Sequence, residues 1–455
     1  MARLVAISNR TAADTGAQAG GLAVAVWDAL KATGGLWAGW SGDIVSDSPG
    51  SRQFESEDGV SFLLTDMTED EHDGFYLRYS NSTLWPIFHY RVDLATFDRD
   101  AFDHYLAVNE RLANLTIEHL REDDMVWVHD YHFLPMADAL RRAGWKGRTG
   151  FFLHIPFPTP DMFRALPEHS WLAHALCQFD LIGFQSESDR TNFTRYLVDS
   201  LDADASEAPV YIVGGRRVRV GVYPIGIDAA AFEEAARSPA ADEAASRIGR
   251  FLGNRDLIIG VDRMDYSKGL PQRFEAVGAF FDNHPELHGK VSVTQIATPS
   301  RTKVEEYRQL RHELDQLVGR INGDYGDLDW IPVRYLARSY SRDELAGLFR
   351  IARVGLVTPL RDGMNLVAKE YVMAQDPEDP GVLILSEFAG AAEQLEEALI
   401  VNPHDRYTLA DTIQIALTMP LEERKRRWEA LRDVVRRTDI AWWRDLFLTD
   451  LRADI

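Results

Sequence analysis

The sequence predicts an α/β protein made of two doubly wound domains, each a parallel sheet with helices on both faces. Short apolar runs rich in β-branched residues recur along the chain, and most are followed by an amphipathic helical pattern. Such near-continuous apolar strands are typical of parallel sheets, because both faces of the sheet are buried. The runs fall into two series, and 455 residues suffice for two or three domains.

The strand-like runs of the first series are residues 4–8, 125–129, 150–155, 181–184 and 218–223. Those of the second series are residues 257–261, 291–296, 331–335, 354–358 and 382–385. Amphipathic stretches between them predict helices over residues 22–32, 271–283, 302–320 and 342–352.

The two series join near residues 227–246, where an Ala-rich, acidic stretch replaces the strand pattern. The chain after residue 421 has a helical pattern with an aromatic cluster at Trp442, Trp443 and Phe447. We therefore expect an N-terminal domain over residues 1–228, a C-terminal domain over residues 229–440 and a final helix over residues 441–455.

The charge is strongly acidic: 71 Asp and Glu against 49 Lys and Arg give a net charge of −22. This balance disfavours a nucleic-acid partner, because phosphate backbones require a basic face. It does not exclude small anionic substrates, since a few Arg and Lys side chains can dominate one pocket.

The single cysteine, Cys177, cannot form an intrachain disulfide or a multi-thiolate zinc site. The apolar run at residues 4–7 is too short for the core of a signal peptide. No run approaches the roughly 18 apolar residues of a membrane helix. We expect a cytoplasmic protein without a membrane partner.

Polar residues follow several predicted strands directly. Ligands of open α/β sheets bind beyond the carboxyl ends of the strands, so these residues predict a site in a cleft between the two domains. They are Arg10, Asp130, His154, Arg263, Arg301 and Asp362.

The segment over residues 262–271 places Arg263 and Lys268 on either side of a turn, with Pro271 suited to the first turn of a helix. Two cations at such a junction could hold a diphosphate and stabilise it as a leaving group. They could equally be surface cations that pair with Asp262 and Asp265, and the pattern alone does not decide between these interpretations.

The segment over residues 357–370 predicts a strand, a tight turn at Gly363 and a helix capped by Asn365. The backbone N–H groups of Leu366 and Val367 would be a seat for phosphate oxygens, and the carboxylate of Glu370 could accept hydrogen bonds from ribose hydroxyls. The alternative is a capped helix with an ordinary acidic first turn, which the helix dipole favours as well.

A diglycine, Gly20 and Gly21, stands at the start of the first predicted helix and would permit close approach of a phosphate. Neither the G-x-G-x-x-G fingerprint nor a Walker A loop is present, which disfavours a dehydrogenase or an NTPase. His129 and His132 would point to opposite faces of an extended segment, which disfavours a shared metal ion. We favour hydroxyl binding by Asp130 and His154, with a core or supporting position for His129.

Aromatic residues are dense over residues 36–40 and 76–90. Aromatic rings suit the apolar faces of sugars, but the pattern by itself favours a place in the core.

Taken in order, several segments closely resemble the trehalose-6-phosphate synthase family of retaining glycosyltransferases, family 20. The resemblance runs from residue 3 to beyond Pro403 and is carried by residues 8–10, 20–23, 37–42, 84–91, 128–132, 152–158, 262–269 and 361–370. It implies a GT-B arrangement, two Rossmann-like domains facing across a cleft, with the C-terminal helix crossing back onto the first domain.

The reaction implied by the resemblance transfers glucose from UDP-glucose to glucose 6-phosphate and yields α,α-trehalose 6-phosphate and UDP. No cofactor and no metal ion are expected. The leaving phosphate would itself take the proton of the acceptor, so no protein nucleophile is needed. Cationic side chains and a helix dipole would neutralise the diphosphate instead.

The resemblance also implies roles for individual residues, and it replaces the core interpretation of the aromatics. The acceptor site for glucose 6-phosphate would comprise Arg10, Trp40, Tyr76, Trp85, Asp130 and Arg301. The donor site would comprise Gly20, Gly21, His154, Arg263, Lys268, Tyr340, Asp362, Asn365, Leu366, Val367, Ala368, Lys369 and Glu370. The residues expected to act in the reaction itself are Asp130, His154, Arg263, Lys268 and Asp362.

Two alternatives stay open from the sequence: a related transferase with another acceptor, such as glycerol 3-phosphate or a cyclitol, and a catalytically silent nucleotide-sugar sensor. The nucleotide base and the oligomeric state are also open. Members of the family often form dimers or tetramers, so a homo-oligomer is among the expectations.

Overall fold

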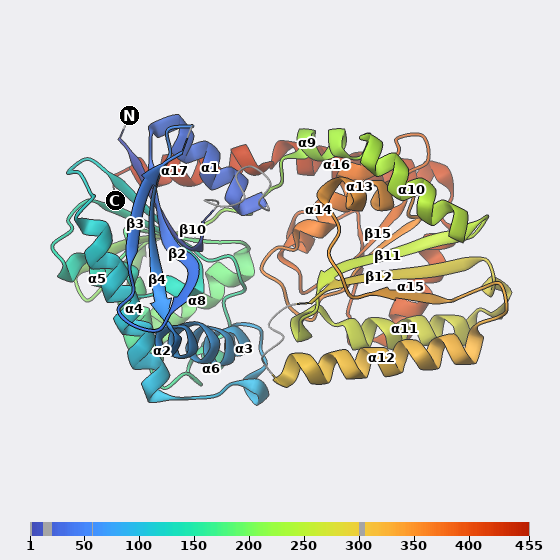
Figure 1. Ribbon diagram of the computed structural model, residues 1–455, viewed down its shortest axis with the longest axis horizontal. Helices are drawn as coiled ribbons and strands as arrows, with labels where there is room; N and C mark the ends of the chain where they lie inside the picture. Colours follow the sequence, from blue (N-terminus) through green and yellow to red (C-terminus); the bar gives the residue numbers. More distant parts are fainter. Residues whose placement is uncertain (1, 12–20, 57, 300–304, 455) are drawn as a thin grey trace. The chain divides into compact units, whose positions relative to one another are not determined.

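The computed structural model describes residues 2–11, 21–56, 58–299 and 305–454. The chain forms two compact units (Figure 1). The first comprises Met1–Ile225 together with Ile440–Ile455, and the second comprises Gly226–Asp439. Each unit has its own sheet with helices packed on it.

In the described part of the first unit the sheet has ten strands in the order β3-β4-β2-β1-β5-β6-β7-β10-β9-β8. The central pairs from β4 to β10 are parallel, whereas β3, β9 and β8 pair antiparallel at the edges. The strands are β1 (Leu4–Arg10), β2 (Leu36–Val45), β3 (Ser51–Glu55), β4 (Ser61–Thr68), β5 (Met125–His129), β6 (Arg148–Phe152), β7 (Leu181–Phe184), β8 (Asp204–Glu207), β9 (Val210–Val213) and β10 (Arg216–Val222).

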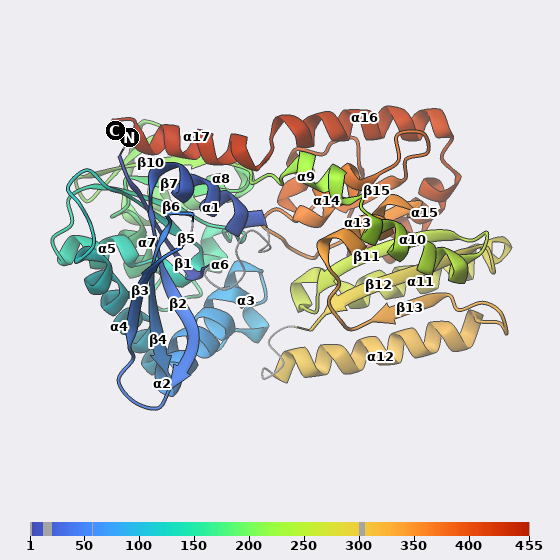
Figure 2. The same ribbon diagram turned by 45° about the horizontal axis from the view of Figure 1, so that its top comes forward.

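The helices of the first unit lie on both faces of this sheet. They are α1 (Gly21–Thr33), α2 (Glu69–Glu71), η2 (His72–Leu84), α3 (Trp85–Phe88), η3 (Val92–Leu94), α4 (Arg99–Ile117), η4 (Tyr131–Phe133), α5 (Met136–Arg142), α6 (Pro160–Phe163), α7 (His169–Leu176), α8 (Glu187–Leu201) and α17 (Ile440–Arg452). The last helix, α17, packs beside α1 and against β6 and β7, so the two ends of the chain share one core (Figure 2).

The sheet of the second unit is entirely parallel, in the order β13-β12-β11-β14-β15-β16. Counted within the unit this is 3-2-1-4-5-6, the Rossmann order. The strands are β11 (Asp256–Arg263), β12 (Val291–Thr298), β13 (Val333–Leu336), β14 (Val354–Val357), β15 (Val382–Ser386) and β16 (Leu399–Val401). The predicted fold class, α/β with two parallel-sheet domains, is confirmed.

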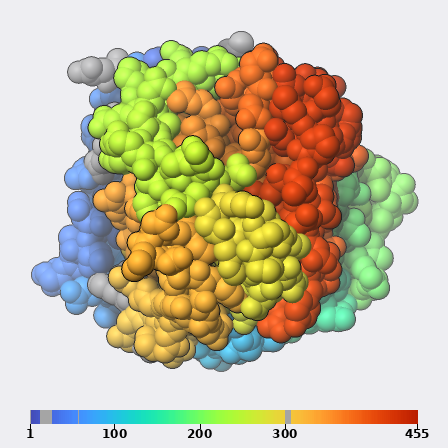
Figure 3. Space-filling view, turned by 90° about the vertical axis from the view of Figure 1, so that its right-hand side faces the viewer, coloured from blue at the N-terminus to red at the C-terminus, as the bar shows by residue number. Residues whose placement is uncertain are grey.

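The helices of the second unit cover its sheet, and Figure 3 shows one face of this unit, with α10 in yellow-green, α12 in orange and α16 in red. They are α9 (Ala229–Ala235), α10 (Pro239–Leu252), η5 (Tyr266–Lys268), α11 (Leu270–Asn283), η6 (Pro285–Leu287), α12 (Glu305–Tyr325), α13 (Arg342–Arg350), α14 (Leu366–Ala374), η7 (Gly390–Glu393), α15 (Arg406–Thr418) and α16 (Leu421–Arg437).

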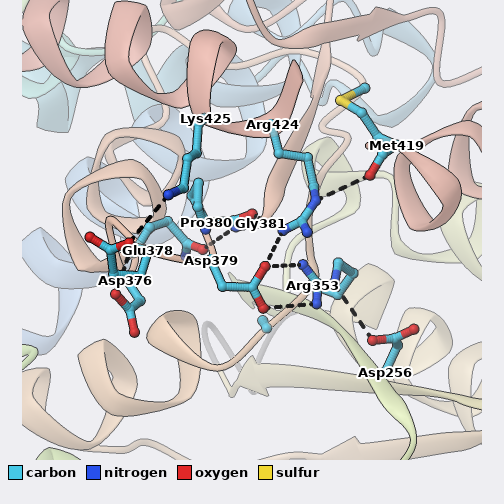
Figure 4. A network of polar contacts seen from close by, with 12 residues as sticks. Asp256, Arg353, Asp376, Glu378, Asp379, Pro380, Gly381, Met419, Arg424 and Lys425 are labelled. Carbon is cyan, nitrogen blue, oxygen red and sulfur yellow. Dashed lines mark hydrogen bonds and ion pairs between the residues drawn. The ribbon is translucent and has the colours of Figure 1, made fainter. Parts of the chain in front are cut away.

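Ion pairs connect the segments at the amino-terminal ends of three strands of the second sheet (Figure 4). The Asp379 carboxylate accepts hydrogen bonds from both terminal nitrogens of Arg353, at 3.0 and 3.1 Å, and from Arg424 of α16 at 2.7 Å. Arg353 also lies 3.5 Å from Asp256, the first residue of β11. The cluster therefore joins α16 to the segments that enter β11, β14 and β15. At the opposite, carboxyl ends of the strands lie polar residues predicted from the sequence, Arg263 at the end of β11 and Asp362 after β14.

Candidate functional site

At the carboxyl end of β1, Arg10 lies over an aromatic ring of the neighbouring strand. Its guanidinium carbon is 4.2 Å from the centre of the Trp40 ring, and the two residues are partners in the β1–β2 register. Trp40 is only 5% exposed, whereas Arg10 is exposed. Gly42 has a φ of +93°, and a Cβ there would lie 2.3 Å from Nη1 of Arg10. The missing side chain at Gly42 thus leaves the space that the guanidinium fills.

An aromatic row continues from Trp40 into η2. The Tyr76 ring lies 5.9 Å from Trp40 and stacks on His132 at 5.8 Å, while His72 contacts both Trp40 and Tyr76. The element η2 is a π-helix, a form that is frequent at functional sites. Its widened turns are tied by side chains: Ser80 and Asn81 each donate a 2.7 Å hydrogen bond to the carbonyl five residues earlier.

A second group of contacts leads from this row to the loops after β5 and β6. Trp85 stacks on His89 and lies 5.6 Å from Tyr131, the residue that follows Asp130. Asp130 adopts a φ of +75°, which is strained for a residue with a side chain. Its N–H donates to Phe152 O at 2.8 Å, and its Oδ1 accepts from the N–H of His154 at 3.3 Å. These bonds hold the Asp130 carboxylate beside His154.

The His154 side chain is half-buried and bonded to a second histidine. His154 Nε2 lies 3.2 Å from His129 Nδ1. Burial lowers the pKa of His154 to about 3 and also holds the pKa of His129 well below its usual value. Both imidazoles are therefore neutral at pH 7, which suits His154 to a sugar hydroxyl rather than to a phosphate. His129 therefore occupies a buried position that supports His154, as expected from the sequence.

In the second unit, the turn after β11 carries the two predicted cations. Arg263 ends the strand and is exposed, whereas the Lys268 side chain is largely buried. Lys268 Nζ donates a 2.5 Å hydrogen bond to Asp362 Oδ2. Gly269, with a φ of +65°, packs against the carbonyl of Thr358, and α11 follows with Pro271 in its first turn, as predicted.

The interpretation of Lys268 as a surface cation paired with Asp262 or Asp265 is wrong. Asp262 instead forms a buried ion pair with Arg273, which is 1% exposed and also bonds Gln295 and Thr358. Asp265 accepts from the Tyr307 hydroxyl at 2.9 Å. Asp262 and Asp265 thus bond to other side chains around the turn, and the carboxylate that pairs with Lys268 is that of Asp362.

The turn before α14 is organised by Asp362 and Asn365. Asn365 donates from Nδ2 to Asp362 Oδ2 at 3.0 Å and caps the helix by accepting from the N–H of Ala368 at 3.3 Å. The predicted cap is confirmed, but the left-handed residue of the turn is Asn365, with a φ of +74°, and not Gly363. The helix geometry leaves the N–H groups of Leu366 and Val367 without an intrahelical acceptor, at the positive end of the dipole.

The first turns of α14 also carry two ionisable side chains whose pKa values are shifted by burial. Lys369 is fully buried and donates to Gln394 at 2.7 Å, and burial lowers its pKa to about 7. Burial raises the pKa of Glu370 to about 7, an effect that the charge of Arg342 opposes. Tyr340, which precedes α13, accepts a hydrogen bond from Arg338 at 2.8 Å.

Within the described ranges, no three His, Cys, Asp or Glu side chains are grouped so that they could hold a metal ion. None of the helices in those ranges combines the length and the apolar character that crossing a bilayer requires.

The family model described as glycosyltransferase family 20 matches residues 4–453. The chain belongs to glycosyltransferase family 20. Among relatives, it is 48% identical over 454 residues to the trehalose-6-phosphate synthase of Klebsiella pneumoniae, covering 99% of this chain and 95% of the relative. It is also 48% identical to the trehalose-6-phosphate synthase of Sodalis glossinidius, over 99% of this chain and 96% of the relative.

Solved structures of the family superpose on the whole chain. An α,α-trehalose-phosphate synthase (UDP-forming) of Burkholderia vietnamiensis has a TM-score of 0.96 at 47% identity, covering 100% of this chain and 97% of that one. The Burkholderia xenovorans synthase, in complex with glucose-6-phosphate, has a TM-score of 0.95 at 47% identity, covering 99% and 100%. The Escherichia coli protein bound with UDP-2-fluoro glucose has a TM-score of 0.96 at 46% identity, covering 100% of both chains.

For this family 20 chain, the structure places the predicted site residues in two sets. The set on the first unit is Arg10, Trp40, Tyr76, Trp85, Asp130 and His154, linked by the contacts given above. The set on the second unit is Arg263, Lys268, Asp362, Asn365, Leu366, Val367, Ala368, Lys369 and Glu370, with Tyr340 before α13. Gly21 begins α1, whereas Gly20 and Arg301 lie outside the described residues.

Two histidines that contact the first set were not predicted from the sequence as site residues. The rings of His72 and His132 both stack on Tyr76, at 5.4 and 5.8 Å, and complete the aromatic row. His72 stands four residues before Tyr76, a helical spacing that could have signalled the contact. His132 was weighed only as a metal ligand.

Proposed function

We propose that this family 20 enzyme transfers glucose from UDP-glucose to glucose 6-phosphate with retention of configuration, forming α,α-trehalose 6-phosphate and UDP. The observation that supports the donor half most strongly is the group made by Lys268, Asp362 and Asn365 at the start of α14. It combines a cation, a carboxylate and a helix N-terminus, which suit a diphosphate, a sugar hydroxyl and phosphate oxygens respectively.

In this proposal the donor diphosphate is bound by Arg263, Lys268 and the N–H groups of Leu366 and Val367. As the bond between the anomeric carbon and the phosphate oxygen breaks, negative charge grows on that oxygen, and Lys268 stabilises it. Asp362 accepts a hydrogen bond from a hydroxyl of the glucosyl unit that is being transferred. Glu370 accepts hydrogen bonds from the ribose hydroxyls.

The acceptor is bound by the set on the first unit except His154, which contacts the donor glucose. Arg10 pairs with the phosphate of glucose 6-phosphate, the rings of Trp40, Tyr76 and Trp85 line the sugar, and Asp130 orients its hydroxyls. The anomeric hydroxyl of the acceptor attacks the face from which the diphosphate leaves and gives its proton to the phosphate oxygen. The products are the disaccharide phosphate and UDP, and no covalent enzyme intermediate forms.

Product analysis with glucose 6-phosphate and UDP-, GDP- or ADP-glucose tests this proposal. We expect a disaccharide phosphate with UDP-glucose, and the small coupling constants of two α-anomeric protons in its NMR spectrum would demonstrate retention. A β-linked product would contradict retention. Product only from glycerol 3-phosphate or a cyclitol would contradict the acceptor, and absence of any product would favour the silent sensor.

A further inference from the structure

The His129–His154 pair is closed off from solvent on the His129 side. The His129 side chain is 0% exposed and its Nδ1 lies 3.2 Å from His154 Nε2. Because both rings are neutral, one of these nitrogens carries the proton of the bond and the other accepts it. His129 Nε2 is buried and has no hydrogen-bond partner among the described residues, and a buried N–H without an acceptor is costly, so the proton of His129 belongs on Nδ1. His129 Nδ1 then donates to His154 Nε2, and His154 carries its own proton on Nδ1, the nitrogen outside this bond.

Aromatic rings keep the pair in place. The His129 ring lies 4.5 Å from Trp127, and the His154 ring lies 4.7 Å from Phe152. Trp443 of α17 is fully buried and lies 6.2 Å from His154 and 6.5 Å from His129. The bonded pair thus packs against two strands of the sheet and one helix, which restricts rotation of either ring.

We propose that His129 is a positioning residue that fixes the ring plane and the tautomer of His154, the side chain assigned to the donor glucose. This inference rests on the proposed function for its catalytic consequence, but not for the state of the histidine pair itself. With a fixed tautomer, His154 Nδ1 offers one defined hydrogen-bonding role to a sugar hydroxyl. Without His129, the two neutral tautomers of His154 would compete. In part of the enzyme molecules, Nδ1 of His154 would then face the sugar hydroxyl without its proton.

Three substitutions at position 129 test the proposal. His129→Phe keeps a ring but removes the bond, His129→Asn places an amide where Nδ1 stands, and His129→Gln carries the same amide one carbon further. In ¹⁵N NMR spectra of histidine-labelled protein, we expect a single His154 tautomer in the wild type and in His129→Asn. We expect a mixture in His129→Phe and His129→Gln.

Kinetics give a second readout. We expect kcat/KM for UDP-glucose to fall about 10- to 100-fold in His129→Phe and to recover to within a few-fold in His129→Asn, with KM for glucose 6-phosphate unchanged. His169→Phe is the matched control, because His169 of the same unit is also hydrogen-bonded, to the Tyr196 hydroxyl at 2.5 Å. It should alter neither the His154 spectrum nor the kinetics.

Unchanged His154 signals in His129→Phe would overturn the proposal. So would equal spectra in the Asn and Gln variants, a comparison that remains readable if the Phe variant fails to fold. If the wild-type enzyme shows the expected His154 tautomer but no transfer to glucose 6-phosphate, the proposed function fails while the positioning of His154 stands.

Discussion

Lys268 and Asp362 stand 94 positions apart in the sequence and form a 2.5 Å hydrogen bond in the structure. The pair joins the turn after β11 to the turn before α14, and the same carboxylate oxygen also accepts from Asn365. Because both side chains are largely withdrawn from water, the contact between them is less screened than a surface ion pair. Lys268 is thereby held at the helix N-terminus to which the proposed function assigns the donor diphosphate.

Replacing Lys268 by Ala should lower kcat by about 100-fold or more, because the growing charge on the leaving group loses its stabilising cation. KM for glucose 6-phosphate should stay within about twofold of the wild type, since Lys268 belongs to the donor set. Steady-state kinetics with both substrates varied check this. Lys425→Ala, which removes an ion pair with the exposed Glu378, is the control. Near-normal turnover in Lys268→Ala would remove Lys268 from the leaving-group role.

Replacing Arg10 by Ala should raise KM for glucose 6-phosphate about 10- to 100-fold and leave KM for UDP-glucose nearly unchanged. The expected loss is that of one charge-assisted contact to the acceptor phosphate. Glucose should serve as a poor acceptor equally well with both proteins, because it lacks the phosphate. An unchanged dependence on glucose 6-phosphate would show that Arg10 does not bind the phosphate.

Gly42→Ala should imitate part of this effect without altering any charge. The new Cβ would lie 2.3 Å from Nη1 of Arg10 and would displace the guanidinium from the Trp40 ring. We expect KM for glucose 6-phosphate to rise several-fold. Gly34→Ala is the matched control, because Gly34 has a φ of +60° with no atom within 4 Å of its Cβ position. A wild-type KM in Gly42→Ala would contradict this prediction. An equal rise in KM in both variants would assign the rise to backbone strain alone.

The affinity for UDP-glucose should depend on pH through Glu370. Burial raises the pKa of this carboxyl to about 7, so it is mostly protonated at pH 6 and mostly ionised at pH 8. The ionised form accepts hydrogen bonds more strongly, and we expect the dissociation constant to rise several-fold from pH 8 to pH 6. Isothermal titration calorimetry checks this. Glu370→Gln should bind weakly with a flat profile, and an unchanged slope in this variant would assign the titration to another group.

Stability should depend on acid through Asp379. Hydrogen bonds from Arg353 and then Arg424 lower the pKa of this carboxyl from 3.8 to about 2. Its contribution is therefore present above about pH 4 and is lost as the pH falls toward 2. Because the side chain is 54% exposed, we expect Asp379→Asn to cost only about 1 kcal/mol at pH 7.

Urea unfolding between pH 3 and pH 7 measures this contribution, and the difference between wild type and Asp379→Asn should shrink toward the acid end. Glu378→Gln is the control, since its pair with Lys425 is 87% exposed on the carboxylate side. A difference that stays constant over the whole range would contradict the assignment.

Much of the fold follows from local patterns. Every predicted strand run overlaps a strand of the structure, because fully buried parallel strands require continuous apolar residues such as those at the start of β1. The strands β2, β3, β4, β8, β9 and β16 were missed. The five residues of β3 are all exposed, and β2 ends in exposed positions, so these segments lack an unbroken apolar run.

The candidate site could be predicted only as a list of residues. The positions of Asp130, Lys268 and Asp362 after strands follow from the sequence, and so does the cap formed by Asn365. The stacking of Tyr76 on His132 joins the π-helix η2 to the segment after β5, and a contact between such distant segments follows from no local period. Which carboxylate pairs with Lys268 depends equally on contacts between distant segments.

The sequence by itself determined the two series of strands, the acidic surface with a few cations at strand ends, and the family to which the chain belongs. These properties depend on hydrophobic periodicity and on short motifs, both of which are local. Only the tertiary structure decided that Lys268 bonds Asp362, that His129 supports His154 and that Arg10 lies over Trp40. Such pairings join segments far apart along the chain, and their partners are selected by burial and geometry rather than by spacing.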